Sequence, residues 1–189
     1  MNEYWGKKVK PRKERQNSVV HDLLQHVIRP KTIIDVGCGP GHSADKIDGF
    51  NYFLGLDNSL PFIEYAKKLF KKDKRYKFVQ WDLLKNAPID RRKFDLCICN
   101  YVAEHSTDPL GCYNILLKKV KARRYLLSFL TNKIKDKRFR YSHGTLIGET
   151  SMLKWLSQFK HWLWPVGDLS KEGIGVPAIS WFAVILKDY

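Results

Sequence analysis

The sequence lacks any long apolar run. No stretch of the 189 residues approaches the roughly 20 consecutive apolar residues that a membrane-spanning helix needs. Residues 1–17 are polar and basic, and they contain no apolar core of the kind found in secretory signal peptides. We therefore expect no membrane partner and a cytoplasmic location, which for a viral product is the cytoplasm of the host.

Cysteine is scarce and is not spaced for metal binding. The four cysteines are Cys38, Cys97, Cys99 and Cys112, and no two of them form a C-x-x-C pair. Structural zinc sites are usually built on such pairs, so we expect no metal site. Cys97 and Cys99 share one face of a predicted buried strand, where a free cysteine behaves as a small core residue.

Acidic residues are few relative to basic ones. Asp and Glu number 19 against 34 Lys and Arg, which gives a formal net charge of +15 at pH 7. Such a charge permits nucleic acid or another polyanion as a partner, with RNA one possibility. Lysine-rich helices that merely face solvent would give the same composition, so charge alone does not decide between the two.

Length and composition indicate one folded domain. A chain of 189 residues, 44% of them hydrophobic, is long enough for one buried core. Residues 1–16 are rich in Lys and Arg, and we predict that they form a flexible basic arm. Helical spacing of apolar residues begins near residue 17, so we place the domain at 17–189.

A glycine-rich turn at residues 32–41 organises the prediction. Thr32 to Val36 read as a short buried strand, and Gly37, Gly39 and Gly41 follow at alternate positions before a helix start. Strand, glycine turn and helix form the local plan of a nucleotide-binding α/β unit. A nicotinamide-binding G-x-G-x-x-G would need glycine at position 42, where this chain has His42. The spacing is instead G-x-G-x-G, with Asp35 two residues before the first glycine.

Three further predicted strands follow, each with a polar signal at or near its end. Residues 52–57 form a strand that ends in Asp57, and residues 77–83 form a strand and its exit. Residues 93–101 begin with Lys93-Phe94-Asp95, and Glu104-His105 with Asp108-Pro109 come just after them. In a parallel sheet, groups at the carboxyl ends of strands meet at the edge where ligands bind.

These four ordered motifs, which cover about residues 18–130, resemble those of class I S-adenosylmethionine (SAM) dependent methyltransferases. The resemblance implies an α/β fold, a three-layer α-β-α sandwich with a mostly parallel seven-stranded sheet whose last strand is antiparallel. It also implies SAM as the methyl donor. SAM carries an ammonium and a sulfonium but no pyrophosphate, so a carboxylate beside the turn suits it.

The resemblance assigns residues to the donor site. Asp57 and its neighbour would meet the ribose, and the exit of the third strand would meet the adenine. Trp81 either stacks on the adenine or packs in the core, and Asp82 either binds the adenine amine or closes a turn. The implied cofactor-binding set is Asp35, Gly37, Cys38, Gly39, Gly41, Asp57, Asn58, Trp81, Asp82, Leu83 and Asn100.

Candidate catalytic residues lie just beyond the fourth strand. His105 is the first choice as a general base, because histidine titrates near neutral pH. Tyr101 is a second candidate, and Glu104 and His143 are weaker ones. A helix-start residue bonded to backbone is the alternative interpretation of His105.

The C-terminal part has weaker signals. We predict a basic loop at 131–148, a helix at 149–159 with Met152, Leu153, Leu156 and Phe159 inward, and strands at 162–166 and 178–186. The arm and this loop lie on the predicted catalytic side, and either they bind the acceptor or they are solvated. The loop residues concerned are Lys133, Lys135, Lys137, Arg138, Phe139, Arg140, Tyr141 and His143.

The acceptor is constrained mainly by absent motifs. Residues 100–103 lack the paired prolines of amino-methylating DNA enzymes, and the chain has no Pro-Cys of the kind that a cytosine C5 enzyme uses. We expect methyl transfer to an oxygen or nitrogen of a small molecule. An RNA (or other polyanion) methyltransferase is one alternative, and a non-catalytic SAM-fold protein that binds nucleic acid is another. The oligomeric state is left open.

Overall fold

A computed structural model gives the structure of the chain, and it describes residues 28–41, 43–44, 47–87, 92–132, 139–141, 144–168 and 178–187. The predicted arm, most of the helix predicted to follow it and the basic run at 133–138 lie outside these residues, as does His143. Within the described segments, no helix is long and apolar enough to cross a membrane.

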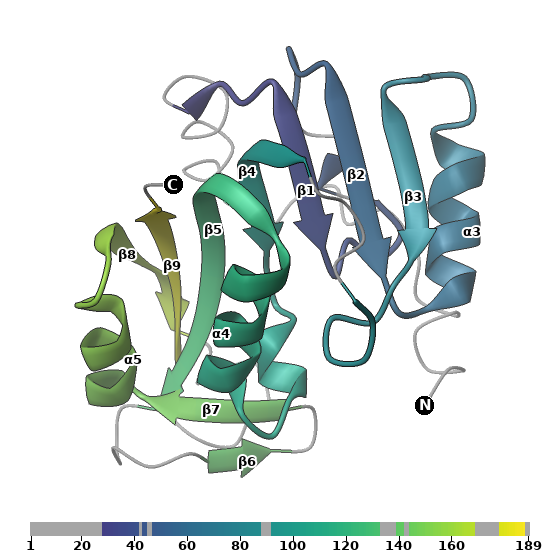
Figure 1. Ribbon diagram of the computed structural model, residues 1–189. Coiled ribbons are helices and arrows are strands. Elements are labelled where there is room, and N and C mark those ends of the chain that lie inside the picture. The colour runs from purple at the N-terminus through teal and green to yellow at the C-terminus, as the bar shows by residue number, and fades with distance from the viewer. Residues whose placement is uncertain are drawn as a thin grey trace.

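Five parallel strands form the centre of the sheet in the order β3-β2-β1-β4-β5 (Figure 1). The interiors of β1, β2, β4 and β5 are almost continuously buried, as expected for strands covered on both faces, whereas β3 lies at the edge of the sheet. The carboxyl ends of β1 to β4 lie at one edge of the sheet, the lower edge in Figure 1. The strands are β1 (Thr32–Val36), β2 (Tyr52–Asp57), β3 (Tyr76–Gln80), β4 (Lys93–Cys99) and β5 (Lys121–Asn132).

Two antiparallel strands extend the sheet beyond β5. The last strand, β9 (Ala178–Leu186), pairs antiparallel with β5, and β8 (Lys160–Asp168) pairs antiparallel with β9. The predicted antiparallel last strand is therefore confirmed, and so is the α/β fold class with a mostly parallel sheet.

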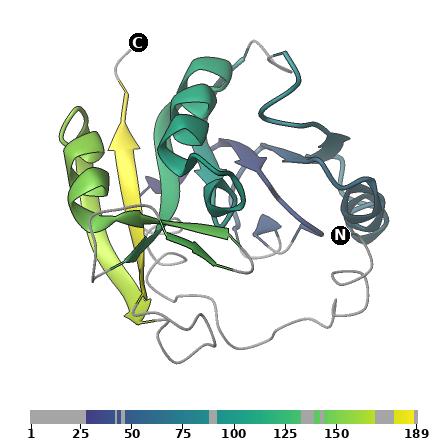
Figure 2. The same ribbon diagram turned by 90° about the horizontal axis from the view of Figure 1, so that it is seen from below.

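The sheet has nine strands in the described residues, where seven were predicted. The difference is a hairpin of β6 (Phe139–Tyr141) and β7 (Gly144–Gly148), in a region predicted to be a loop. Its origin is the length of β5. The β4 ladder ends where Cys99 meets Leu127, so the last five residues of β5 have an open edge, and β7 pairs there through Ile147 and Gly148. The hairpin thus lies across the carboxyl edge (Figure 2).

Helices cover both faces of the sheet. On one face, α4 (Pro109–Lys119) and α5 (Glu149–Leu156) enclose a core that contains Tyr113 and Trp155. On the other face, Ile63 of α3 (Leu60–Leu69) packs into a second core. A single 3₁₀ turn, η3 (Ala103–His105), joins β4 to α4. These two cores give the predicted three layers.

The helix near residue 150 differs in detail from the prediction. It ends at Leu156 rather than at residue 159, and Leu153 is 45% exposed, so the prediction that Leu153 points inward is wrong. Trp155 is buried on the inner face instead. Its indole N–H donates to the Asn114 side-chain oxygen over 2.9 Å, which satisfies the polar atom of a large buried ring.

Candidate active site

The backbone N–H groups of the turn after β1 form hydrogen bonds within the protein. Gly37 and Cys38 both donate their N–H groups to the carbonyl of Leu56, over 2.7 and 3.0 Å, and the Gly41 N–H donates to the Cys38 carbonyl over 3.0 Å. Gly39 donates to Asp57 Oδ2 over 2.9 Å. Every N–H from 37 to 41 is thus bonded within the protein, since residue 40 is proline. The turn therefore offers no free N–H groups to a phosphate. This agrees with SAM as the methyl donor, because SAM carries no phosphate.

The surroundings of two of the glycines explain why a larger residue would not suit these positions. All three adopt positive φ, at 75°, 54° and 92° for Gly37, Gly39 and Gly41. A Cβ on Gly37 would lie 2.1 Å from Val102 Cγ2, so a larger residue cannot fit between β1 and η3. A Cβ on Gly39 would meet nothing within 4 Å and would project into open space. That space beside the turn is where a ligand can approach the backbone closely.

Asp35 is a buried acid with one oxygen left unpaired. Its side chain is 2% exposed, and its Oδ2 has no hydrogen-bond partner among the described residues. Burial, and secondarily the charge of Asp57, raises the pKa of Asp35 to about 7, against the effect of a hydrogen bond from Ser43. A buried oxygen without a partner is costly, so this position calls for a donor or a cation from a ligand.

Asn100 supplies a second unpaired oxygen at the same edge. Asp35 pairs with Ile98 in the sheet, so Asn100 follows two residues beyond that pair, just after β4 ends. Its Oδ1 is likewise buried and unpartnered within the described segments. Two unpaired oxygens and the open space over Gly39 fit SAM, whose ammonium can donate hydrogen bonds and whose sulfonium is cationic. Asp35 and Asn100 would hold those groups.

Asp57 shapes the turn from the end of β2. Its Oδ2 accepts the Gly39 N–H, and its Oδ1 accepts the Ser59 N–H over 2.8 Å. Asn58 is exposed beside it, and its carbonyl accepts from the Gln80 side chain. Asp57 therefore holds the loops on either side of the open space, and its contact with a ribose stays a prediction.

The exit of β3 shows what Trp81 and Asp82 do. Trp81 is 5% exposed, and its indole N–H donates to the Ala87 carbonyl over 2.9 Å, so the packing alternative holds for this ring. The Asp82 Oδ1 accepts the Leu84 N–H over 2.9 Å and closes the turn. Leu83 is buried beneath that turn. Adenine contacts by Asp82 and Leu83 stay predictions.

Tyr101 occupies a strained position at the end of β4. Its φ is +56°, a conformation that residues other than glycine seldom adopt, and strain of this kind clusters at functional sites. Its N–H donates to Ser128 Oγ over 2.6 Å, and its hydroxyl lies 3.0 Å from Ser180 Oγ. The side chain is 41% exposed and lies near β9, so Tyr101 is positioned at the ligand edge.

The two residues after Ala103 face opposite environments. His105 ends η3 and is exposed, with its backbone N–H donating to the Val102 carbonyl. Glu104 is only 6% exposed, and burial raises its pKa to about 7. Sequence reasoning ranked Glu104 below His105 because histidine titrates near neutral pH, and it did not predict β7, which lies against η3. The base role of His105 stays a prediction.

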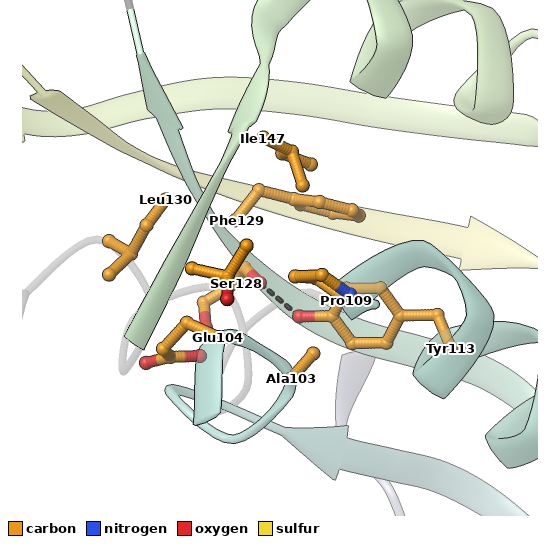
Figure 3. A pocket seen from close by; sticks show the side chains of 9 residues that line it. Ala103, Glu104, Pro109, Tyr113, Ser128, Phe129, Leu130 and Ile147 are labelled. Carbon is orange, nitrogen blue, oxygen red and sulfur yellow. Dashed lines mark hydrogen bonds between the residues drawn. The ribbon is translucent and has the colours of Figure 1, made fainter. Parts of the chain in front are cut away.

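A pocket lies beside Glu104 between η3, α4, β5 and β7 (Figure 3). Its cavity volume is about 10 Å³, which is room for about one water-sized group, and apolar side chains form most of its wall. The lining residues are Ala103, Glu104, Pro109, Tyr113, Ser128, Phe129, Leu130, Thr145 and Ile147.

The cysteines lie in the core. All four are buried free thiols, and burial raises the pKa of Cys97 and of Cys99 well above the usual value. In the described ranges, no three His, Cys, Asp or Glu side chains gather closely enough to hold a metal ion.

Comparison with known proteins agrees with this geometry. The family model described as "Methyltransferase domain" matches residues 29–163, which is more than half of the chain. Comparison with curated proteins finds no match.

Solved structures with the same fold have low sequence identity to the chain. The methyltransferase domain of a bacterial Hen1 protein is 21% identical with a TM-score of 0.63, and the match covers 89% of this chain and 95% of that one. The N-terminal domain of EvdMO1, solved with S-adenosylhomocysteine (SAH) and D-fucose, is 13% identical with a TM-score of 0.68, covering 84% and 77%.

Magnesium protoporphyrin IX methyltransferase from Synechocystis, solved with SAH, is 17% identical with a TM-score of 0.60, covering 85% and 76%. At these identities the likeness shows the fold, and the family match shows the kind of domain. The chain belongs to the methyltransferase-domain family, and it is a class I methyltransferase whose methyl donor is SAM.

Proposed function

We propose that the protein transfers the methyl group of SAM to an oxygen or nitrogen atom of a small molecule. The observation that carries this proposal is the pocket beside Glu104. It lies at the ligand edge of the sheet, next to the turn that receives the donor, and its cavity of about 10 Å³ has room for one water-sized group, such as a hydroxyl or amino group. Most of its wall is apolar with few polar groups, which is typical of sites for small molecules.

Two of the structural neighbours support this choice by analogy. One is named as a methyltransferase of magnesium protoporphyrin IX, and another was solved in the presence of D-fucose. Both are small molecules. Neither is proposed as the acceptor here, because a fold hosts many substrates.

The alternative acceptor is RNA or another polyanion, and the net charge of +15 favours it. The described part of that charge includes Lys67, Lys68, Lys71, Lys72 and Lys74, all exposed. Lys67 and Lys68 lie in the last turn of α3, and the other three follow it toward the amino end of β3, so all five lie at the edge opposite the donor turn. A polyanion held there would be bound away from the reacting methyl. This alternative therefore rests on the predicted arm and on the basic run at 133–143.

Transfer of labelled methyl from SAM tests the proposal directly. The full chain is incubated with labelled SAM and with separate pools of metabolites, RNA, DNA and protein. We expect label in the metabolite pool, on oxygen or nitrogen. Label confined to RNA would overturn the small-molecule proposal in favour of the RNA alternative.

Calorimetry with SAM separates either enzyme from a non-catalytic nucleic-acid-binding protein. We expect SAM to bind with a 1:1 stoichiometry. Absence of SAM binding together with intact RNA binding would favour the non-catalytic alternative.

A further inference from the structure

Glu104 has a largely buried carboxyl group that bonds to no other described side chain. The side chain comes from η3 and lies against the pocket, as Figure 3 shows. Among the described residues, its own backbone N–H donates a hydrogen bond to that carboxyl. Buried acids are normally paired with other residues, so a largely buried acid that faces a pocket and lacks such a partner indicates a ligand group.

The pocket has the polarity of a site for one hydroxyl or amino group. Apart from Glu104, polar side chains at its wall are Ser128, Thr145 and Tyr113, and the Tyr113 hydroxyl already donates to the Ser128 carbonyl. The remaining wall is apolar, with Phe129 and Ile147 among its residues. A single small polar group surrounded by apolar surface matches this lining.

The pocket is next to the donor turn. Val102, two residues before Glu104, packs against Gly37 of the turn. The thiol of Cys99, at the end of β4, also lies within electrostatic reach of both sites. Its pKa is raised first by burial and also by the charges of Glu104 and Asp35. The chain thus reaches Glu104 two residues after its direct contact with the donor turn.

We propose that Glu104 is the catalytic base, and that its pocket receives the O–H or N–H group of the acceptor that becomes methylated. This inference rests on the proposed function and deepens it by assigning the acceptor subsite. It replaces His105, which is exposed at the end of η3, as the first choice for the base.

The proposed step balances as a displacement with proton transfer. A lone pair of the acceptor oxygen or nitrogen forms the new bond to the methyl carbon. The carbon–sulfur bond breaks, and its electron pair stays on sulfur, which gives SAH. The acceptor proton moves to a carboxylate oxygen of Glu104 and later passes to solvent. A base whose pKa is near the working pH is effective in such a transfer.

Burial and a bound ligand determine the protonation state of Glu104, because the groups around it carry no charge at pH 7. Among described residues, the titratable groups that it influences are Cys99 of β4 and Cys112 and Tyr113 of α4, and burial raises the pKa of all three. They are therefore neutral at pH 7. From β5 and β7, the pocket receives Ser128 and Thr145, which do not titrate in this range. No described cation offsets the Glu104 charge.

The first test uses ethanolamine as the probe, because it is small and presents both O–H and N–H donors. The full chain is saturated with SAH, and ethanolamine is added while the ¹³C resonance of the Glu104 carboxyl is followed by NMR. We expect the resonance to shift and Glu104→Gln to abolish ethanolamine binding. Glu64→Gln, in exposed α3, is the matched control and should bind as the unmodified chain does. Absence of ethanolamine binding, or equal binding by Glu104→Gln, overturns the inference.

The second test measures the rate of methyl transfer against pH, using the pool that accepts label. We expect the rate of the unmodified chain to rise as Glu104 loses its proton. Glu104→Gln should be slower by on the order of 10²-fold and should lack that rise. A Glu104→Gln rate that still rises with pH overturns the inference. SAH affinity, measured by calorimetry, should be equal in the unmodified chain, Glu104→Gln and Glu64→Gln. If the unmodified chain binds no SAH, the proposed function fails independently of Glu104.

Discussion

The backbone N–H of Gly39, in the turn after β1, donates to the carboxylate of Asp57 at the end of β2 over 2.9 Å. The other oxygen of that carboxylate accepts the Ser59 N–H over 2.8 Å. One acid thus fixes two loops that border the donor space. Asp57 has a structural task that is independent of any contact with the ribose.

Replacing Asp57 should therefore weaken SAM binding through the shape of the turn. Asp57→Ala removes both acceptors, and hydrogen bonds to a charged group are each worth about 1.5–3 kcal/mol. We expect a loss of SAM affinity of at least about tenfold by calorimetry, with a smaller loss for Asp57→Asn, which keeps one acceptor oxygen. Asp73→Asn, at an exposed site paired with Arg75, serves as the control. Normal affinity in Asp57→Ala would contradict this role.

The glycines at 37 and 39 should respond differently to alanine. At Gly37 the new Cβ would lie 2.1 Å from Val102 Cγ2, and overpacking of this kind costs about 1–3 kcal/mol. At Gly39 the Cβ meets nothing, so only the positive φ adds about 1–2 kcal/mol, but the methyl group enters the donor space. We expect Gly37→Ala mainly to lower stability and Gly39→Ala mainly to lower SAM affinity.

A double-mutant cycle with Val102→Ala checks the Gly37 explanation. Removing the Val102 methyl groups relieves the contact, so Gly37→Ala should cost less free energy of unfolding in that background. Chemical denaturation measures all four proteins. An unchanged cost would show that the positive φ, rather than Val102, excludes alanine.

SAM affinity should depend on pH through Asp35. Its pKa is raised to about 7 by burial, and a bound cation stabilises its charged form, so SAM binding should release a proton below that pH. Affinity should fall about tenfold per pH unit below pH 7, and Asp35→Asn should bind weakly with no such dependence. Calorimetry between pH 5 and pH 8 in about unit steps resolves the slope. A slope that survives in Asp35→Asn would assign the proton to another group.

Glu104 should lower the stability of the fold at high pH. Its pKa is about 7 in the folded chain against an ordinary value of 4.5. The folded state therefore binds the proton more tightly, and this contribution to stability is present below pH 4.5 and is lost as pH rises through 7. The shift corresponds to about 3 kcal/mol. We expect Glu104→Gln to be more stable than the unmodified chain at pH 8, with the difference vanishing near pH 4.

Urea denaturation at the two pH values gives the comparison, and Glu64→Gln at an exposed site is the control. A Glu104→Gln protein that is equally destabilised at both pH values would mean that the carboxyl is paired in the fold. That result would also remove the basis for an acceptor group in the pocket.

The central strands and the turn could be predicted because their signals are local. Residues 32–36 and 52–57 form β1 and β2 with the predicted bounds. Strands buried on both faces read as continuous apolar runs, and the spacing of three glycines needs no tertiary information. The positive φ at each glycine and the unpaired oxygen of Asp35 agree with that interpretation.

The acceptor side could not be predicted because its structure depends on contacts between distant segments. The β7 strand is five residues long, and its pairing edge exists only because β5 outlasts β4. β7 lies against η3, which carries Glu104, so the surroundings of this glutamate cannot be recognised from the short motif that contains it. The orientation of α5 also depends on packing, since Trp155 and Leu153 are both apolar and only one of them can face the core.

The contact between Val102 and Gly37 also has a consequence for how tightly the two substrates bind. It joins the turn that receives the donor to the element that carries Glu104, with no spacer between them. A ligand that displaces either one changes the energy of the other, and such coupling is reciprocal. If the acceptor binds more tightly once the donor is present, the donor must be retained more tightly, by the same factor, once the acceptor is present. The affinities for the two substrates are therefore coupled through a contact between one valine and one glycine.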